Sequence, residues 1–308
     1  MDRISVIVPC FNEEESLPLF YQETTGVLKA MENITYELLF IDDGSSDQTR
    51  EVIKELAAMD SHVRYVIFSR NFGKEAGMYA GLQEAAGDYC VIMDADLQHP
   101  PALLPEMYQV VSREGYDCCG GKRMGREGDG AIRSLLSRAF YKIGKGLTHL
   151  EMCDGYGDFR MMSRKMADAI LEVREYNRYM KGIFSFVGFQ TKWIPYENVE
   201  RSKGQSKWSF RSLLAYAFEG ILSFSTAPLK LAGVMSGLLL AGGLLVALAG
   251  VWQTISGTGS FGIWQAILAV VLLIGGLQML VIYILGAYLS KDYLENKRRP
   301  IYIVKEKG

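Results

Sequence analysis

The segment VIMDADLQHPP, residues 91–101, begins as an apolar run and then places two carboxylates, Asp94 and Asp96, one residue apart, followed by the amide of Gln98. If this run is a strand, both carboxylates lie on one face and Ala95 points away. Carboxylates held this close repel each other unless one is protonated or a cation lies between them. Mg²⁺ and Mn²⁺ prefer oxygen ligands, which commonly include phosphate oxygens, so the segment predicts a divalent metal with a phosphate-bearing ligand. The alternative is an acidic turn solvated by water.

Short apolar runs alternate with helical patterns in the part of the chain around this segment. The strand-like runs are ISVIVPCF (4–11), YELLFIDD (36–43), VRYVIFSR (63–70) and DYCVIMDAD (88–96), and segments 16–31, 47–59 and 73–87 between them carry apolar residues at helical spacing. Alternation of this kind predicts an α/β fold with a mostly parallel sheet covered by helices on both faces. Ligands of such sheets bind beyond the carboxyl ends of the strands.

The four predicted strands all end in polar residues, most of them acidic. The ends read PCFNEEE, IDDGSSD, SRNFGKEAG and MDADLQ. Each could be a turn or a helix cap, but four such ends at one edge of a sheet indicate a binding site. No GxGxxG follows the first strand and the sequence has no P-loop, so neither a nicotinamide-dependent enzyme nor a P-loop kinase is favoured.

The composition is that of a folded protein. The chain has 308 residues, of which 49% are hydrophobic and 22% are charged, and its formal net charge is −2. This balance gives no general attraction for nucleic acid. The five cysteines and three histidines are scattered without the spacing of zinc ligands, so a zinc site is not expected. We interpret the cysteines as small apolar residues of a protein in a reducing compartment.

The character of the chain changes near its end, because residues 231–290 contain no Asp, Glu, Lys or Arg. Two apolar runs, PLKLAGVMSGLLLAGGLLVALAGVW and IWQAILAVVLLIGGLQMLVIYILGAYL, are joined there by the polar link QTISGTGSFG. Each run is about as long as the ~20 residues that cross a bilayer core, so we expect two transmembrane helices over residues 227–290. The alternative, a pair of buried core helices, would require a large shell of protein around them.

Basic residues flank the two apolar runs, whereas the link between the runs has none. They are Arg201, Lys203, Lys207 and Arg211 before the first run and Lys230 at its start, and Lys291, Lys297, Arg298 and Arg299 after the second. The positive-inside rule then predicts a multi-pass protein of the cell membrane with both termini in the cytoplasm. We expect a cytoplasmic α/β domain over 1–200, interfacial helices over 201–226, the two spans over 227–290 and a cytoplasmic tail over 291–308.

Two segments, 122–147 and 200–224, interleave basic residues with apolar and aromatic ones. Such patterns are typical of amphipathic helices that lie on a membrane surface. Near an anionic leaflet each basic residue contributes about 1 kcal/mol to binding. We therefore expect membrane lipids among the partners, with general adhesion as the alternative to a specific lipid ligand.

Six motifs in order along the chain resemble the inverting family 2 glycosyltransferases of the GT-A fold. They are PCFNE (9–13), IDDGSSD (41–47), RNFGKEAG (70–77), DADLQHPP (94–101), DGYGDFRMMSR (154–164) and ERSKGQSKW (200–208). Within that family the chain is similar to the polyprenyl-phosphate glycosyltransferases, which include dolichol-phosphate mannose synthases and bacterial undecaprenyl-phosphate (bactoprenol) glucosyltransferases. The resemblance covers essentially the whole chain and implies a GT-A, Rossmann-like sheet followed by the membrane hairpin.

The resemblance also implies a nucleotide-sugar site at the strand ends. Its residues would be Pro9, Phe11, Glu13, Asp42, Asp43, Lys74, Asp94, Ala95 and Arg123. Asp42 or Asp43 would contact the base. The metal, Mg²⁺ or Mn²⁺, would be held by Asp94, Asp96 and Gln98 and would act on the diphosphate as Lewis acid and template.

Catalytic roles are implied for Asp158, Asp96 and Arg133. Asp158 is the position of a catalytic base, with Asp154 as an alternative, yet a phosphate monoester with a second pKa near ~6 hardly needs one. We therefore expect Asp158 to orient the acceptor or the arginines around it. The residues expected to grip the lipid phosphate are Arg133, Arg201, Ser206 and Lys207, and Arg123 is expected to grip that phosphate or the donor diphosphate.

The expected reaction is inverting transfer of a hexose from a nucleotide-sugar to polyprenyl (undecaprenyl) phosphate at the cytoplasmic membrane face. UDP-glucose is the first choice of donor, while GDP-mannose, UDP-GlcNAc, UDP-galactose and an aminoarabinose donor remain open. A processive polysaccharide synthase is disfavoured because QxxRW does not occur in the sequence. A transporter is disfavoured because residues 231–290, which make up nearly all of the predicted spans, carry no charge. An inactive nucleotide-sugar-binding protein remains an alternative, and Gly-rich patches at 241–243 and 274–276 are compatible with a homo-oligomer.

Overall fold

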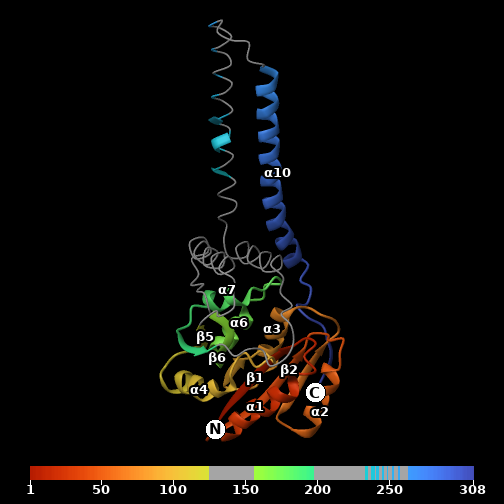
Figure 1. Ribbon diagram of the computed structural model, residues 1–308, viewed down its shortest axis with the longest axis vertical. Helices are drawn as coiled ribbons and strands as arrows, with labels where there is room; N and C mark the ends of the chain where they lie inside the picture. Colours follow the sequence, from red (N-terminus) through yellow and green to blue (C-terminus); the bar gives the residue numbers. More distant parts are fainter. Residues whose placement is uncertain are drawn as a thin grey trace. The chain divides into compact units, whose positions relative to one another are not determined.

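A computed structural model of the chain describes residues 1–124, 156–197 and 263–308, together with scattered helical positions between 233 and 256. Figure 1 follows the chain by colour from its N-terminus to its C-terminus and labels the elements. The chain forms two compact units, of which one comprises Met1–Ala217 with Arg299–Gly308 and the other comprises Phe218–Arg298. The chain therefore leaves the first unit, builds the second and returns to the first.

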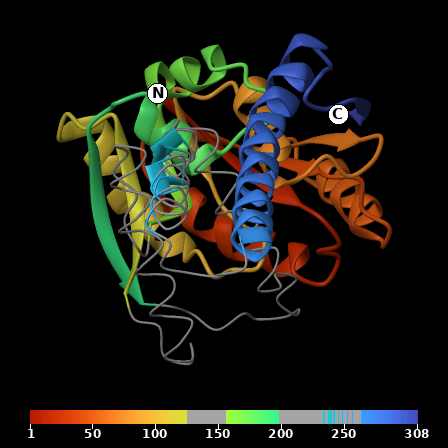
Figure 2. The same ribbon diagram turned by 90° about the horizontal axis from the view of Figure 1, so that it is seen from above.

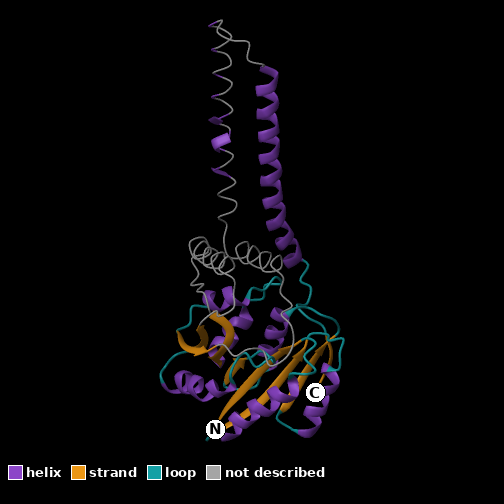
Figure 3. Ribbon diagram, in the orientation of Figure 1, coloured by secondary structure: helices purple, strands orange, loops and turns teal. Residues whose placement is uncertain are grey.

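The described strands of the first unit form one eight-stranded sheet in the order β7-β5-β6-β4-β1-β2-β3-β8, drawn in orange in Figure 3. The strands are β1 (Asp2–Cys10), β2 (Ile34–Asp42), β3 (Val63–Phe68), β4 (Tyr89–Ile92), β5 (Cys118–Met124), β6 (Tyr156–Ser163), β7 (Thr191–Glu197) and β8 (Val304–Lys307). Strands β4, β1, β2 and β3 pair in parallel, whereas β6 runs antiparallel to β4 and β8 antiparallel to β3. The predicted α/β fold with a mostly parallel sheet is confirmed.

Helices cover both faces of this sheet. The described helices of the first unit are α1 (Leu17–Ala30), α2 (Thr49–Met59), α3 (Lys74–Glu84), the 3-10 turn η1 (Pro101–Leu103), α4 (Leu104–Arg113), α6 (Arg164–Glu172) and α7 (Met180–Phe186). Alternate residues of β1, Ile4, Val6 and Val8, are buried in one core with side chains of α1, α2 and α4. Ile7 points to the other face, where α3 and α6 pack.

Helix α3 packs closely against the sheet. At Gly81 an added Cβ would overlap the side chain of Ile7, and at Gly77 it would lie 3.3 Å from Cβ of Pro9. The helix starts at Lys74 directly after Gly73, whose φ of 98° is readily adopted by glycine. Lys74 is therefore brought to the edge of the sheet at which β1 and β2 end.

The C-terminal segment is part of the same sheet. Strand β8 pairs antiparallel with the outer edge of β3, so residues 299–308 of the predicted tail 291–308 belong to the first unit. In Figure 1 the C-terminus lies beside α2, and Figure 2 shows the blue end of the chain beside the orange segments from above. The short, lysine-bearing β8 also covers the unpaired edge that β3 would otherwise present.

The described part of the second unit contains one long apolar helix, α10 (Ile263–Asn296), of 34 residues. Its stretch Leu273–Asn296 is long and apolar enough to cross a membrane, by length and composition. Most of α10 coincides with the second predicted span. The first predicted span lies largely outside the described residues, although its described positions between 233 and 256 are helical. The predicted interfacial segment 201–226 lies outside them entirely.

The buried carboxylate of Glu37, in β2, is hydrogen-bonded to residues of both neighbouring strands, β1 and β3. Its side chain is 1% exposed and accepts hydrogen bonds from the guanidinium groups of Arg3 (2.8 Å) and Arg64 (2.9 Å). The hydroxyl of Ser5 and the backbone N–H of Ala86 also donate to it. Burial alone would raise the pKa of Glu37, but these donors outweigh burial and hold the pKa below its ordinary value.

We expect Glu37→Gln to lower the free energy of unfolding by about 2 kcal/mol at neutral pH, because the neutral amide loses charge-assisted bonds in a buried place. Because the folded pKa is depressed, the stabilisation is complete above the unfolded value of about 4.3 and is lost as the pH falls through the folded pKa. Urea unfolding followed by circular dichroism should show the difference from wild type shrinking below about pH 4. Glu55→Gln, at an exposed position of α2, is the control. A difference independent of pH would contradict this account.

Candidate active site

The two carboxylates of the DAD segment lie in a turn rather than in a strand. Strand β4 ends at Ile92, and the backbone N–H of Asp94 donates to Nδ1 of His99 (3.0 Å) instead of to a neighbouring strand. The N–H of Gln98 donates to Oδ1 of Asp96 (3.1 Å), and Leu97 between them has a φ of 59°. The expectation that both carboxylates share one strand face is therefore wrong. The turn is closed by its own side chains, with Asp96 buried and Asp94 partly exposed.

Lys74, the first residue of α3, bridges Asp94 and Asp158. Its Nζ lies 2.7 Å from Oδ1 of Asp94 and 3.0 Å from Oδ2 of Asp158. The register of the sheet explains the meeting, because Ile92 of β4 is paired with Arg160 of antiparallel β6. Asp94 follows Ile92 by two residues and Asp158 precedes Arg160 by two, so both carboxylates extend past the same edge. One cation thus joins two distant parts of the chain.

All three members of this bridge are charged at neutral pH. Burial would raise the pKa of Asp94 and of Asp158, but the ammonium of Lys74 outweighs it and both values lie below the ordinary range. Burial would conversely lower the pKa of Lys74, but the two carboxylates raise it above its ordinary value. Lys181 and Arg160 also lower the pKa of Asp158, so several cations balance the carboxylates of this group.

The carboxylate oxygens of Asp94 and Asp96 fit a hard divalent cation whose remaining ligands come from a substrate. Asp94 and Asp96 offer carboxylate oxygens one residue apart, which are the ligands that hard divalent cations prefer. Among the described residues no group of three or more His, Cys, Asp or Glu is arranged to hold a metal by itself. Mg²⁺ is typically bound in this way, by one or two carboxylates with substrate phosphates and water completing the octahedron.

Two side chains next to the turn were not among the predicted site residues. His99 is buried, its ring stacks on Phe159 (centroids 4.9 Å apart), and its Nδ1 accepts the N–H of Asp94, which fixes that part of the turn. Tyr196 of β7 packs edge-on against the same Phe159. Burial raises the pKa of Tyr196, Arg123 opposes the rise and Asp94 adds to it. The phenol is therefore close enough to Asp94 for the charge of that carboxylate to affect its pKa. Tyr196 is distant from the turn in sequence, so the sequence gave no signal of its proximity, whereas His99 lies within the quoted DADLQHPP motif.

Asp43 is held by the segment that joins β3 to α3. The backbone N–H groups of Phe72 and Gly73 donate to its two carboxylate oxygens at 2.6 and 2.9 Å. Burial raises the pKa of Asp43 to about 6, more than these two hydrogen bonds lower it. Gly44 follows with a φ of 70°, and an added Cβ there would overlap the backbone of Arg70. Asp43 and the segment 69–73 therefore form one rigid corner at the end of β2.

Asp42 is committed to a different set of partners. Its carboxylate is fully buried, forms an ion pair with Arg50 (3.0 Å) and accepts the N–H of Ser45. Asp42 thus shapes the loop after β2, while Asp43 faces the segment after β3. The structure separates the two neighbouring carboxylates that the sequence could not tell apart.

The end of β1 reaches the same edge. Pro9 and Phe11 lie at and just after its last residues, and Glu13 accepts a hydrogen bond from the hydroxyl of Ser16 at the start of α1. Asn12 has a φ of 54°, and its side-chain oxygen accepts the N–H of Ser46 in the loop after β2. Hydrogen bonds between these two loops therefore hold the first two predicted motifs together.

Comparison with known proteins identifies the family. The family model for "Glycosyl transferase family 2" matches residues 5–171, more than half of the chain. The chain belongs to glycosyltransferase family 2. The resemblance predicted from the six motifs is thereby confirmed, as are the enzyme class and the GT-A type of fold.

The curated relatives of this glycosyltransferase match it over nearly its full length. A putative glycosyltransferase of Bacillus subtilis is 41% identical over 98% of this chain and 91% of its own. A prophage bactoprenol glucosyl transferase homolog of Escherichia coli and a bactoprenol glucosyl transferase of Shigella phage SfV are each 38% identical over 98% of both chains. Among solved structures, glucosyl-3-phosphoglycerate synthase of Mycobacterium tuberculosis matches with a TM-score of 0.48 and 20% identity, over 72% of this chain and 78% of that one.

The glycosyltransferase brings several predicted residues to one place. Asp94, Ala95, Asp96, Gln98, Lys74 and Asp158 surround the turn after β4, while Pro9, Phe11, Glu13, Asp42 and Asp43 lie at the ends of β1 and β2. Arg123 is exposed on β5, in register with Tyr196. Arg133, Arg201, Ser206 and Lys207, as well as the alternative base Asp154, lie outside the described residues.

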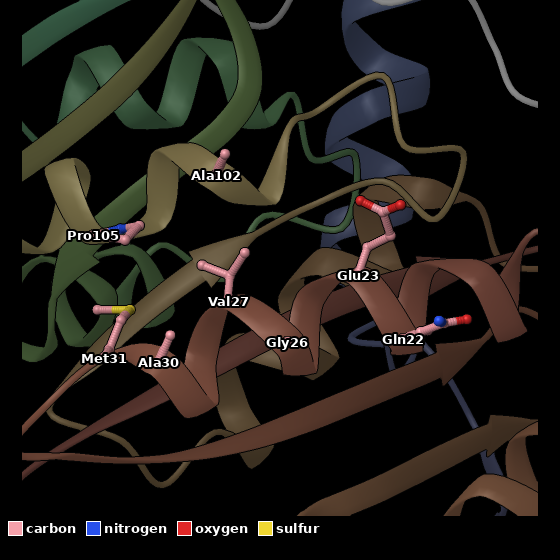
Figure 4. A pocket seen from close by; sticks show the side chains of 8 residues that line it. All are labelled: Gln22, Glu23, Gly26, Val27, Ala30, Met31, Ala102 and Pro105. Atoms are coloured by element: carbon pink, nitrogen blue, oxygen red, sulfur yellow. The ribbon is translucent and has the colours of Figure 1, made fainter.

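A groove elsewhere on the glycosyltransferase is distinct from this site. Figure 4 shows side chains of α1 on one side and of η1 and α4 on the other. The lining residues are Gln22, Glu23, Gly26, Val27, Ala30, Met31, Ala102 and Pro105. None of the predicted site residues is among them, so the groove belongs to the packing between helices.

Proposed function

We propose that this glycosyltransferase transfers glucose from UDP-glucose to polyprenyl (undecaprenyl) phosphate at the cytoplasmic face of the cell membrane. The observation that carries the proposal is the similarity to bactoprenol glucosyl transferases, which extends through the catalytic unit and the C-terminal helix alike. The apolar α10 supports a place at the membrane. Two spans with both termini in the cytoplasm, as well as a homo-oligomer, are part of the proposal.

In this proposal Asp94 and Asp96, with Gln98, would hold a Mg²⁺ or Mn²⁺ ion. The ion would offset charge that develops on the departing nucleoside diphosphate, as Lewis acid and template. Pro9, Phe11, Glu13, Asp42 and Asp43 would enclose the nucleoside. Of the last two, Asp43 is the better partner for the base, because Asp42 is fully buried and ion-paired with Arg50, whereas Asp43 accepts backbone N–H groups and each of its oxygens keeps a further lone pair. Lys74, Ala95 and Arg123 would line the path of the diphosphate and sugar.

The proposed transfer depends on the positioning of the donor and the acceptor more than on proton transfer. An oxygen of the acceptor phosphate bonds to the anomeric carbon while the bond from that carbon to the diphosphate oxygen breaks, and the electron pair leaves with the diphosphate. Attack from the opposite side inverts the configuration, so an α-linked donor gives a β-linked product. Asp158 would hold Lys74 in place beside the donor, since its ionised carboxylate contacts that ammonium. Arg133, Arg201, Ser206 and Lys207 would bind the lipid phosphate.

The test is a donor panel with the purified full-length protein in detergent. Undecaprenyl phosphate is offered with UDP-glucose, GDP-mannose, UDP-GlcNAc or UDP-galactose, and Mn²⁺ or Mg²⁺ is added after treatment with EDTA. We expect metal-dependent glucosyl lipid from UDP-glucose, with a β-anomeric coupling in its proton spectrum. Nucleoside diphosphate released equally without lipid would contradict the acceptor, and a lipid product from another donor alone would contradict the choice of sugar. Donor binding without any turnover would favour the inactive binding protein.

A further inference from the structure

The C-terminal segment 299–308 is attached to the outer strand of the catalytic sheet by more than one kind of contact. Gly308 and Tyr65 of β3 exchange two backbone hydrogen bonds, of 2.8 and 3.1 Å. Glu306 forms an ion pair with Lys54 of α2 (2.7 Å), although both side chains are substantially exposed and such pairs contribute little. The backbone pairing therefore fixes the register of the segment, and the ion pair adds to it.

The side chain of Tyr302 contacts both β3 and α3. Its ring stacks on Phe68, the last residue of β3, with centroids 4.8 Å apart and an interplanar angle of 20°. Its hydroxyl donates to Oε1 of Gln83 on α3 (3.0 Å), and its ring also packs against Tyr79 (6.5 Å). The next residue, Ile303, accepts the N–H of Ser69 through its carbonyl oxygen (2.9 Å). Tyr302 and Ile303 therefore both contact the C-terminal end of β3.

That point is where the chain turns toward the active site. Phe68 is fully buried and packs edge-on against Phe72 (5.8 Å), and the N–H of Phe72 donates to Asp43. Gly73 donates to the same carboxylate, and the next residue is Lys74. A continuous path of packed groups therefore runs from Tyr302 through Phe68 and Phe72 to the corner that holds Asp43. Residues 69–73 contact Asp43 and lead directly into Lys74, and both of these residues are candidate contacts of the nucleotide-sugar.

We propose that the C-terminal segment is a positioning element of the donor site, in which Tyr302 holds residues 69–73 against Asp43. The inference rests on the proposed function, because it assigns Asp43 and Lys74 to the donor. It makes Tyr302 a positioning residue, since its contacts with the described residues are to Phe68, Tyr79 and Gln83 and not to the carboxylates of Asp43 or Asp94. It also gives a reason for the return of the chain to the first unit after the second.

The alternative is that the segment stabilises the edge of the sheet and does nothing more. Covering an edge strand is useful by itself, and loss of that cover would lower stability without changing the donor site of molecules that remain folded. The two accounts differ in what happens to the folded fraction. Positioning predicts a weaker donor interaction with little change in the lipid acceptor, whereas edge protection predicts unchanged Michaelis constants.

The experiment compares Tyr302→Ala with Tyr302→Phe and Lys305→Ala in the full-length protein. Phenylalanine keeps the stacked ring, and Lys305 is an exposed residue of β8 that serves as a control within the same segment. A stacked aromatic pair accounts for roughly a three- to tenfold change in an equilibrium constant. We expect Tyr302→Ala to raise the donor KM by about that factor and to leave the acceptor KM nearly unchanged. We expect Tyr302→Phe and Lys305→Ala to stay within about twofold of wild type.

A second measurement does not depend on turnover. Hydrogen exchange followed by mass spectrometry should show faster exchange in residues 69–73 of Tyr302→Ala, with β1 and β2 unchanged. Calorimetry with UDP and Mn²⁺ should show the same loss of affinity. Failure of the wild-type protein to transfer glucose would contradict the proposed function. Hydrogen exchange in residues 69–73 would still test whether Tyr302 holds these residues against Asp43. A Tyr302→Ala protein with a lower melting temperature but with unchanged donor KM, UDP affinity and exchange in 69–73 would overturn the inference.

Discussion

Asp96→Asn is expected to lower kcat/KM by about 10³-fold while the protein stays folded. The substitution removes one negative charge from the pair that would hold the metal, and a single electrostatic contact to a developing anion is worth 10² to 10³ in rate. Asparagine keeps an oxygen that can still accept the N–H of Gln98, so the turn after β4 is retained. The loss would therefore report on charge and not on local unfolding.

Asp60→Asn is a matched control for this variant. Asp60 closes a similar turn, in which its Oδ1 accepts the N–H of His62 two residues later (2.9 Å), but it lies between α2 and β3 at the opposite edge of the sheet. We expect nearly normal turnover from it. Steady-state kinetics over a range of Mn²⁺ concentrations should show that Asp96→Asn needs much more metal than wild type. Turnover by Asp96→Asn at wild-type rate and metal concentration would contradict a metal role for this pair.

The sheet and its polar edge could be predicted because hydrophobic periodicity reports burial directly. The run predicted over 36–43 became β2 at Ile34–Asp42, and the helix predicted over 47–59 became α2 at Thr49–Met59. Strand β4 is the exception, since the run predicted to residue 96 stops being a strand at Ile92. Alternating polarity across Asp94 and Asp96 looks the same in a strand and in a turn that its own side chains close, so sequence reasoning could not separate the two.

The partners within the site could not be predicted, because they depend on register between distant segments. No pattern in the sequence near Lys74 or Asp158 indicates that they are in contact. The pairing of β6 with β4 and the close packing of α3 on β1 bring them together. Strand β8 is a stronger case. The residues VKEK have no apolar alternation, and they become a strand because β3 offers an unpaired edge and Tyr302 stacks beside it.

Asp158→Asn is expected to lower kcat/KM by about 10²-fold through the placement of Lys74, the order of loss typical of residues that orient a ligand-binding group. Lys74 contacts both Asp94 and Asp158, and without the second carboxylate its ammonium is held from one side. Lys74→Met should cost a similar factor, and the double variant should lose little more than either single one, because interacting residues are not additive. Asp168→Asn, on the exposed side of α6, is the control.

The pH profile distinguishes this role from that of a general base. Burial raises the pKa of Asp158 but Lys74 outweighs it, so the carboxylate stays ionised well below neutral pH and contributes no acid limb near pH 6 of its own. The acceptor phosphate titrates near ~6 and the pKa of Asp43 is raised to about 6, so a fall in activity below that pH is expected from those groups. We therefore expect the acid limb to persist in Asp158→Asn at a lower plateau. An acid limb present in wild type and absent from the variant would identify Asp158 as the base.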